Sequence, residues 1–158
     1  MNSAIYEDVT MEESFATQSG FLGARTDLIC PECGQPMTLG QSKYGLFYGC
    51  LRYPDCRATL SAHPDSSPRG VPGDKATRLA RIRAHRVFDR LWTTDGVRPP
   101  LLSRREAYAW LQIEMGLLNK QGIGHLDAAG CERLIQAVQK RYPEIHTVWE
   151  RLLREDAF

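Results

Sequence analysis

Four cysteines near the N-terminal end of the chain have the residue type and spacing of a metal site. Cys30 and Cys33 form a C-x2-C pair, sixteen residues follow, and Cys50 and Cys56 form a C-x5-C pair. Two close thiolate pairs separated by a segment that can fold back suit the tetrahedral coordination of Zn2+. Because four cysteine ligands fill the coordination sphere, the spacing predicts one zinc ion that is structural rather than catalytic.

Other chemistries of cysteine fit this chain less well. A disulfide framework requires an oxidising compartment, and the polar, acidic start of the chain does not resemble a signal peptide. A redox C-x-x-C requires a thioredoxin-like context, which is absent around Cys30. An iron–sulfur centre uses the same ligands and stays an alternative, although the paired spacing fits zinc better. His63 could replace a ligand but is more simply a surface residue, and Cys131 is most simply a small buried hydrophobe.

Short strands must bring the two cysteine pairs together. Between residues 28 and 62, glycines and prolines alternate with short β-prone runs such as KYGLFYG, which is typical of small hairpins. Hairpins of this size cannot form a core unaided, so the metal must hold them together. Residues 1–27 are predicted to be a flexible acidic arm, with a short helix near residues 11–15. Residues 63–73, rich in Pro, Ser and Gly, are predicted to be a linker.

From residue 74 onward the hydrophobic pattern becomes helical. Asp74 is a candidate N-cap of a first helix, and Ser103–Glu106 has the form of a capping box for a second. Asp127 is a candidate N-cap of a third helix, and Pro143 is expected to start a fourth helix. The expected inner faces are Ala80, Ala84, Val87, Phe88, Leu91 and Trp92; Ala107, Trp110, Leu111 and Met115; Cys131, Leu134, Ile135 and Val138; and Ile145, Val148, Trp149 and Leu152. The predicted fold is therefore a small four-cysteine zinc ribbon of short β-hairpins, followed by an all-α domain of three to four helices over residues 74–158.

The net charge of +1 hides a local excess of positive charge. Residues 69–105 contain ten basic and three acidic residues, and many of the arginines lie in the first predicted helix. They flank its apolar stripe, with Arg83, Arg86 and Arg90 on one side and Arg78, Arg81 and His85 on the other. Such a helix could follow a phosphate backbone without reading sequence, although a solvated helix face would carry the same pattern. Arg104 and Arg105 lie in the first turn of the second helix, where the macrodipole disfavours cations, which also indicates an anionic partner.

Aromatic and basic residues cluster between and beside the cysteine pairs. The candidate nucleic-acid-binding residues of the ribbon are Lys43, Tyr44, Tyr48 and Arg52. Tyr44 and Tyr48 are expected on one exposed strand face, where rings could stack on bases and nearby cations could contact phosphates. Phe47 and Tyr53 are expected to cover the metal site. In a ribbon this small, covering the metal could be the only role of some of these rings.

No catalytic constellation is recognisable in the sequence. It contains no G-x-S-x-G, P-loop or H-E-x-x-H motif and no clustered carboxylates. His85 and Asp89 are four residues apart, which a surface pair explains better than a catalytic dyad. The sequence also has no run of roughly 18 apolar residues that could span a membrane. We therefore expect no catalytic residue, no small-molecule substrate and no membrane partner.

The stretch CPECGQPMTLGQSKYGLFYGCLRYPDCRATL resembles the C-terminal zinc-ribbon module of bacterial type IA DNA topoisomerases. The resemblance covers residues 28–62, and its matching positions are Cys30, Pro31, Cys33, Gly34, Met37, Tyr44, Gly45, Phe47, Gly49, Cys50, Tyr53, Pro54 and Cys56. It implies a module that binds single-stranded DNA and can contact RNA polymerase. Strand cleavage is not implied, because the chain has no room for the catalytic core. Leu46 stands where those modules often carry a basic residue, so a phosphate contact is expected to be missing there.

A second resemblance extends over most of the chain. The ribbon followed by AHRVFDRLW, SRREAYAWLQIEMGL and GIGHLDAAGCERLIQAV is similar to a zinc-finger-containing family found in phages and bacteria. This resemblance supports the order of the two parts but implies no activity.

Together these features favour a non-enzymatic, zinc-stabilised nucleic-acid-binding protein. The expected partner is single-stranded or distorted DNA, bound with low sequence specificity. The alternative is an adaptor or inhibitor, of the phage or mobile-element type, that docks on a polymerase, a nuclease or a defence factor. In that case the arginines would meet an acidic protein surface. Either role is expected in the cytoplasm, where thiols stay reduced.

Overall fold

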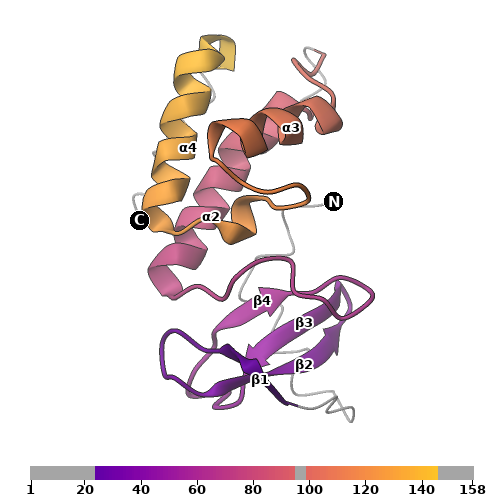
Figure 1. Ribbon diagram of the computed structural model, residues 1–158, viewed down its shortest axis with the longest axis vertical. Helices are drawn as coiled ribbons and strands as arrows, with labels where there is room; N and C mark the ends of the chain where they lie inside the picture. The colour runs from indigo at the N-terminus through magenta and orange to yellow at the C-terminus, as the bar shows by residue number, and fades with distance from the viewer. Residues whose placement is uncertain (1–23, 95–98, 146–158) are drawn as a thin grey trace. The chain divides into compact units, whose positions relative to one another are not determined.

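The computed structural model describes residues 24–94 and 99–145, and within the chain two compact units can be distinguished, residues 1–76 and 77–158 (Figure 1). The described part of the first unit is a β-ribbon that carries the four cysteines. The second unit is helical. A zinc ribbon followed by an all-α domain, the fold class expected from the sequence, is thus confirmed, whereas the exact limits of arm, linker and domains stay a prediction.

The ribbon is a four-stranded antiparallel sheet in the order β1-β2-β3-β4. The strands are β1 (Ala24–Ile29), β2 (Pro36–Ser42), β3 (Gly45–Cys50) and β4 (Thr59–Ser61). Each strand is hydrogen bonded to the next, so the sheet is built from local hairpins, as the short β-prone runs predicted. The register between β1 and β2 shifts between Arg25 and Ile29, just before the first cysteine.

The segment after β4 is partly ordered against the ribbon. The Ser61 carbonyl accepts a hydrogen bond from the Arg69 amide at 2.9 Å, and His63 donates its amide to the Ser67 carbonyl at 2.7 Å. Ala62 and Pro68 form an isolated bridge. The first half of the predicted linker is therefore a loop of the ribbon unit, because its backbone groups find partners there.

Among the residues that the structure describes, the helical unit contains three α-helices: α2 (Lys75–Phe88), α3 (Arg104–Glu114) and α4 (Ala128–Arg141). Three short 3-10 helices accompany them, η2 (Asp89–Leu91), η3 (Ile123–His125) and η4 (Pro143–Ile145). Ser103 and Glu106 form the predicted capping box of α3, and Asp127 caps α4 by accepting a hydrogen bond from the Gly130 amide at 2.6 Å. α3 ends before Gly116, whose φ of +63° suits the left-handed end of a helix.

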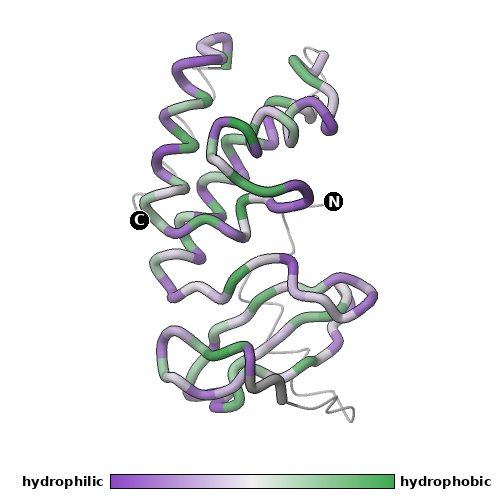
Figure 2. The backbone as a smooth tube through the Cα atoms, viewed as in Figure 1, coloured by the Kyte–Doolittle hydropathy of each residue, from purple (hydrophilic) through white to green (hydrophobic). Residues whose placement is uncertain are grey.

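The inner faces of the three helices pack into one hydrophobic core. The predicted core positions of α2, η2 and α4 are all buried, except that Trp92, just beyond η2, is half-buried. On α3, Ala107 and Leu111 are buried, and Trp110 and Met115 pack against them. Figure 2 shows the resulting alternation of hydrophobic and hydrophilic residues around the turns of α4. The predicted fourth helix begins as η4, and its remaining positions, like the predicted N-terminal helix, lie outside the described residues.

Candidate metal centre and nucleic-acid interface

Two turns at one end of the ribbon hold the cysteine pairs. The first turn links β1 to β2, and it closes through hydrogen bonds from the Cys30 amide to the Gln35 carbonyl and from the Gly34 amide to the Cys30 carbonyl, at 2.8 and 2.9 Å. Gly34 has a φ of +75°, which glycine adopts without strain. The second turn follows β3, and there the Cys56 amide donates to the Arg52 carbonyl at 3.1 Å. Each turn thus presents two sulfur atoms from one short loop.

The four sulfur atoms come together in one group. Cys30 Sγ lies 3.6 Å from Cys56 Sγ, and Cys33 Sγ lies 3.2 Å from Cys50 Sγ. All four sulfurs lie within 4.8 Å of one another. A tetrahedral zinc ion with Zn–S bonds of about 2.3 Å requires sulfurs about 3.8 Å apart. The four cysteines therefore fit a zinc ion with only small adjustments.

The surroundings of the sulfurs explain why a cation belongs there. Burial raises the pKa of Cys50 to about 12 and also raises the pKa of Cys56, because a thiolate is poorly solvated inside the ribbon. A hydrogen bond from the backbone of Gln35 instead lowers the pKa of Cys33 to about 7. The Arg52 amide donates to Cys50 Sγ at 3.4 Å, so backbone N–H groups already point at the sulfurs. Four thiolates in this small space need a divalent cation to balance their charge.

With four protein ligands the coordination sphere is closed, so this site can hold the ribbon together but cannot bind a substrate at the metal. His63 is exposed and does not belong to the sulfur group. Cys131 is fully buried in the core of the helical unit, as predicted for a small hydrophobe.

The tip of the β2–β3 hairpin carries Lys43 and Tyr44. The hydroxyl of Ser42 accepts a hydrogen bond from the Tyr44 amide at 3.1 Å and donates to the Gly45 carbonyl at 3.2 Å. Gly45 has a φ of +121°, which only glycine adopts readily. Lys43 Nζ lies 5.1 Å from the centre of the Tyr44 ring, and Tyr44 remains 45% exposed. The tip is thus a fixed turn with an exposed aromatic ring beside a cation.

Tyr48 does not lie on this exposed surface, and the prediction that it does is wrong. It is 1% exposed, and its hydroxyl donates to the Ser66 carbonyl at 2.7 Å. Cys50 points toward the sulfur group, and Tyr48 lies two residues earlier on the same strand face. Tyr48 therefore belongs to the buried cluster around the cysteines, a role that the sequence pattern had suggested for Phe47. Phe47 is also buried, but it lies outside that cluster.

Arg52 lies at the other end of β3 from the hairpin tip. β3 has six residues, which correspond to roughly 20 Å at the usual rise per residue. Although Arg52 and Tyr44 are close in the sequence, the ribbon places them apart, Arg52 next to the sulfurs and Tyr44 at the tip. Arg52 is exposed.

The arginines of α2 and η2 differ in burial. Arg81, expected on a flank of the helix as a phosphate contact, is instead buried: it is only 7% exposed, and its Nε donates to the Leu126 carbonyl at 2.9 Å. Arg83 forms an ion pair with Glu132 of α4 at 2.9 Å. Arg86 is exposed, and Arg78 and Arg90 are partly exposed. The sequence does not reveal Glu132 as the partner of Arg83, because the two residues lie far apart along the chain.

Two further sequence signals have structural explanations. The guanidinium of Arg104 lies 4.7 Å from the ring centre of Tyr108 and 5.4 Å from that of Trp92, so aromatic contacts hold this cation at the start of α3. His85 Nδ1 lies 3.6 Å from Asp89 Oδ1, but the two side chains are only 13% and 18% exposed. The expected surface pair is therefore partly buried.

Within the described parts of the chain, every helix is too short or too polar to serve as a membrane span.

Several known proteins are similar to this chain over short segments. A 33-residue segment, 21% of the chain, is 52% identical to 4% of DNA topoisomerase 1 of Methanocaldococcus jannaschii. A 46-residue segment, 29% of the chain, is 46% identical to 6% of a plasmid DNA topoisomerase I of Xylella fastidiosa. A 39-residue segment, 25% of the chain, is 46% identical to 22% of an uncharacterized protein of Haemophilus influenzae.

The chain thus covers less than a quarter of the length of these relatives. No solved structure matches the chain significantly. The model of a zinc-finger-containing domain matches residues 26–141, which is most of the chain. That description and the four clustered sulfurs together imply a bound zinc ion. This protein belongs to the family of the zinc-finger-containing domain.

Proposed function

We propose that this protein is a non-enzymatic, zinc-stabilised nucleic-acid-binding protein that favours single-stranded or distorted DNA and reads little sequence. The observation that carries the proposal is the hairpin tip, where Tyr44 is 45% exposed and Lys43 lies over its ring. An exposed ring accepts any base by stacking, and a neighbouring cation attracts the phosphates. The names of the topoisomerase relatives, which share a segment with this chain, support DNA as the partner.

The metal would contribute by fixing the ribbon rather than by contacting DNA. β2 and β3 connect the hairpin tip directly to the cysteine turns. A metal ion bound by the cysteines would therefore hold these two strands, and with them the tip, in one conformation. A fixed tip loses less conformational entropy on binding than a flexible one. When bound, the zinc ion supplies structural cross-linking at the four cysteines, and the residues of the tip make the contacts.

The helical unit would add charge. The arginines of α2 and η2 that are at least partly exposed are Arg78, Arg83, Arg86 and Arg90. Arg81 is buried and so does not belong to the arginines proposed to contact phosphates. Contacts of this kind to phosphates do not depend on base identity, which is why we expect low sequence specificity. Such a protein would act in the cytoplasm, where its thiols remain reduced and available to zinc.

The test is a fluorescence-anisotropy titration of the zinc-loaded protein with labelled single-stranded and duplex oligonucleotides of unrelated sequence, at two salt concentrations. We expect tighter binding to the single strand and weaker binding at the higher salt concentration. Tyr44→Ala should weaken single-strand binding by about fivefold or more, since stacking contributes roughly 1–3 kcal/mol per base. Tyr44→Phe keeps the ring and should bind like the wild type.

The results separate the parts of the proposal. If the wild type does not bind any oligonucleotide at low salt, the proposed function is wrong, and one co-purifying protein would then favour the docking alternative. If the wild type binds but Tyr44→Ala binds equally well, DNA binding stands and the stacking role of the hairpin tip is wrong.

A further inference from the structure

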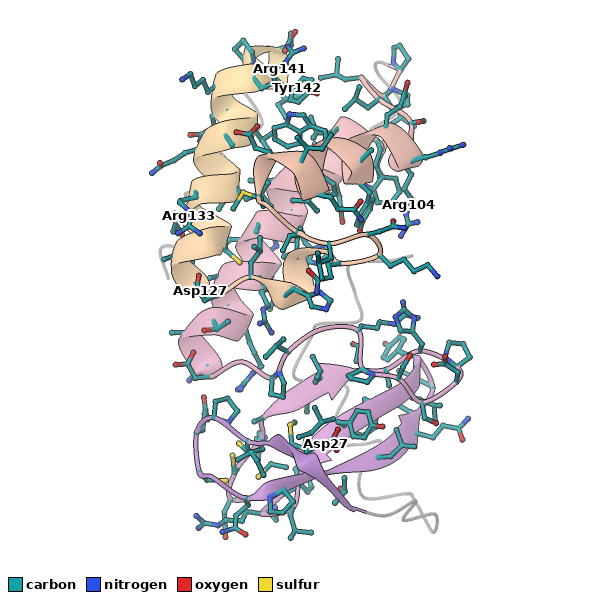
Figure 3. All side chains as sticks on the ribbon, in the orientation of Figure 1. Asp27, Arg104, Asp127, Arg133, Arg141 and Tyr142 are labelled. Carbon is teal, nitrogen blue, oxygen red and sulfur yellow. The ribbon has the colours of Figure 1, made fainter. Side chains whose placement is uncertain are left out.

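The outer face of α4 carries a row of exposed polar side chains that the sequence patterns did not single out. Arg133, Gln136 and Lys140 are spaced i, i+3 and i+7, so they lie along one side of the helix. All three are exposed, whereas Leu134 and Val138 on the inner side are fully buried. Figure 3 shows Arg133 projecting from the side of α4 that faces away from α3. The row therefore places two cations on an open helix surface.

An ion pair joins this row to the arginines of α2. Arg83 of α2 contacts Glu132, the residue next to Arg133, with Nη2 and Oε1 2.9 Å apart. Arg86 lies three residues after Arg83 on the same flank of α2, and Arg90 follows in η2. We call this surface the α2/α4 face and define it by Arg83, Arg86, Arg90, Glu132, Arg133 and Lys140. Five of these six residues are basic.

The ordinary structural roles of surface cations account for only part of this face. Lys140 lies in the last turn of α4, where the macrodipole favours a cation. Arg141 lies 5.0 Å from the ring centre of Tyr142, so this packing explains it and we leave it out of the face. Arg133 has neither explanation: it precedes the last turn, and the residues three and four positions away in the sequence are Gly130, Ala129, Gln136 and Ala137. No acidic residue on its own helix is therefore placed to pair with it.

Glu132 is the one acidic residue of the α2/α4 face. The side chain of Arg83 is 32% exposed and that of Glu132 is 50% exposed, so both ends of the pair are in contact with solvent. An exposed ion pair of this kind contributes little to stability and exchanges easily for another partner. A phosphate could therefore replace the carboxylate of Glu132 as the partner of Arg83 at small cost.

We propose that the α2/α4 face is a second phosphate-binding surface of this protein, in which Glu132 holds Arg83 until a backbone phosphate replaces it. The inference rests on the proposed nucleic-acid binding and deepens it by adding α4 to the contact surface. Arg133, Lys140, Arg86 and Arg90 supply the fixed positive charge, and Glu132 lowers the affinity by competing for Arg83. The ligand chemistry is that of a nucleic acid backbone, because nothing in this row reads a base edge.

The test measures how the dissociation constant for a single-stranded oligonucleotide depends on salt. Each phosphate contact contributes about 0.7 to the slope of log K against log salt for single strands. The double variant Arg133→Gln with Lys140→Gln should lower the slope by about 1.4 and weaken binding at low salt. Glu132→Gln should instead tighten binding by roughly two- to fivefold and raise the slope, since it frees Arg83.

The matched control is the double variant Lys75→Gln with Lys120→Gln, which removes the same charge from exposed positions at the start of α2 and after α3. It should leave the slope unchanged. An unchanged slope in the Arg133 and Lys140 variant, or an equal loss in the control, would overturn the inference but leave the proposed function standing. Absence of wild-type binding would overturn both. Circular dichroism of each variant checks that the helices are intact.

Discussion

Arg81 is a charged residue whose role is structural. Its side chain crosses from α2 to the segment before α4, where Nε donates to the carbonyl of Leu126, and it is 7% exposed. A buried guanidinium without its acceptor would leave a charge in a poorly solvated place. Arg81 therefore anchors α2 to the rest of the helical unit, whereas Arg86, five residues later, lies at the surface.

This contrast makes a prediction about stability. Arg81→Ala should lower the free energy of unfolding of the helical unit by about 2–3 kcal/mol, because it removes a charged hydrogen bond and buried packing. Arg86→Ala should change it by no more than about 0.5 kcal/mol. Urea unfolding followed by tryptophan fluorescence measures both values, since all three tryptophans lie beyond residue 76. Equal stability of the two variants would show that Arg81 is not an anchor.

Tyr44 and Tyr48 show how a strand face is assigned. Both were expected on one exposed face, yet Tyr48 is buried and Tyr44 lies in the turn before β3. The useful reference residue is Cys50, because a metal ligand must face the metal. Residues two positions from a ligand share its face of the strand. Taken from Cys50, the alternation along β3 does place Tyr48 beside the sulfurs.

At the scale of secondary structure, hydrogen bonds at the helix ends fix where α3 and α4 begin. Asp127 accepts from the Gly130 amide at 2.6 Å and so satisfies one of the free amides of the first turn of α4. Gly130 also leaves room for this contact, because a Cβ there would lie 3.0 Å from Asp127 Oδ1. The cap and the small residue three positions later thus act together.

We predict that Asp127→Ala lowers the free energy of unfolding of the helical unit by about 1 kcal/mol. Asp127→Asn should retain most of the stability, since an asparagine oxygen accepts the same hydrogen bond. The midpoint of urea unfolding, with an unchanged slope, measures the difference. A loss with Asp127→Asn as large as with Asp127→Ala would assign the effect to the charge of Asp127 rather than to its hydrogen bond.

At the scale of the whole molecule, the two units have separate sources of stability. Among the described residues, the ribbon cluster has nine buried residues that include three of the four cysteines, whereas the helical core has fifteen buried residues and none of the four clustered cysteines. A small sheet with so little apolar material depends on its metal. The helical unit has a core of the ordinary kind.

Removal of zinc should therefore unfold the ribbon and leave the helical unit folded. After treatment with a chelator, hydrogen exchange measured by mass spectrometry should show loss of protection in β2 and β3 and retained protection in α4. Cys33→Ser should cause a smaller loss of protection in β2 and β3, because it removes one of the four ligands. Equal protection of β2 and β3 with and without zinc would contradict the structural role of the metal.

The sequence by itself determined the features that depend on local spacing. The paired cysteines predicted the metal site, and the caps at Ser103 and Asp127 predicted the starts of α3 and α4. These signals are local because a turn or a helix end forms from residues a few positions apart. The periodic apolar residues likewise identified the inner faces of the helices, since one helix turn repeats every 3.6 residues.

Only the tertiary structure decided which polar and aromatic side chains are exposed. The burial of Arg81, the pairing of Arg83 with Glu132 and the separation of Arg52 from Tyr44 all depend on segments distant in the sequence. An amphipathic pattern distinguishes the inside of an element from its outside, but it does not identify the neighbour that covers each flank. For that reason the spacing of the cysteines predicts the metal site residue by residue, whereas only the fold shows which side chains of the surface proposed to bind nucleic acid are exposed.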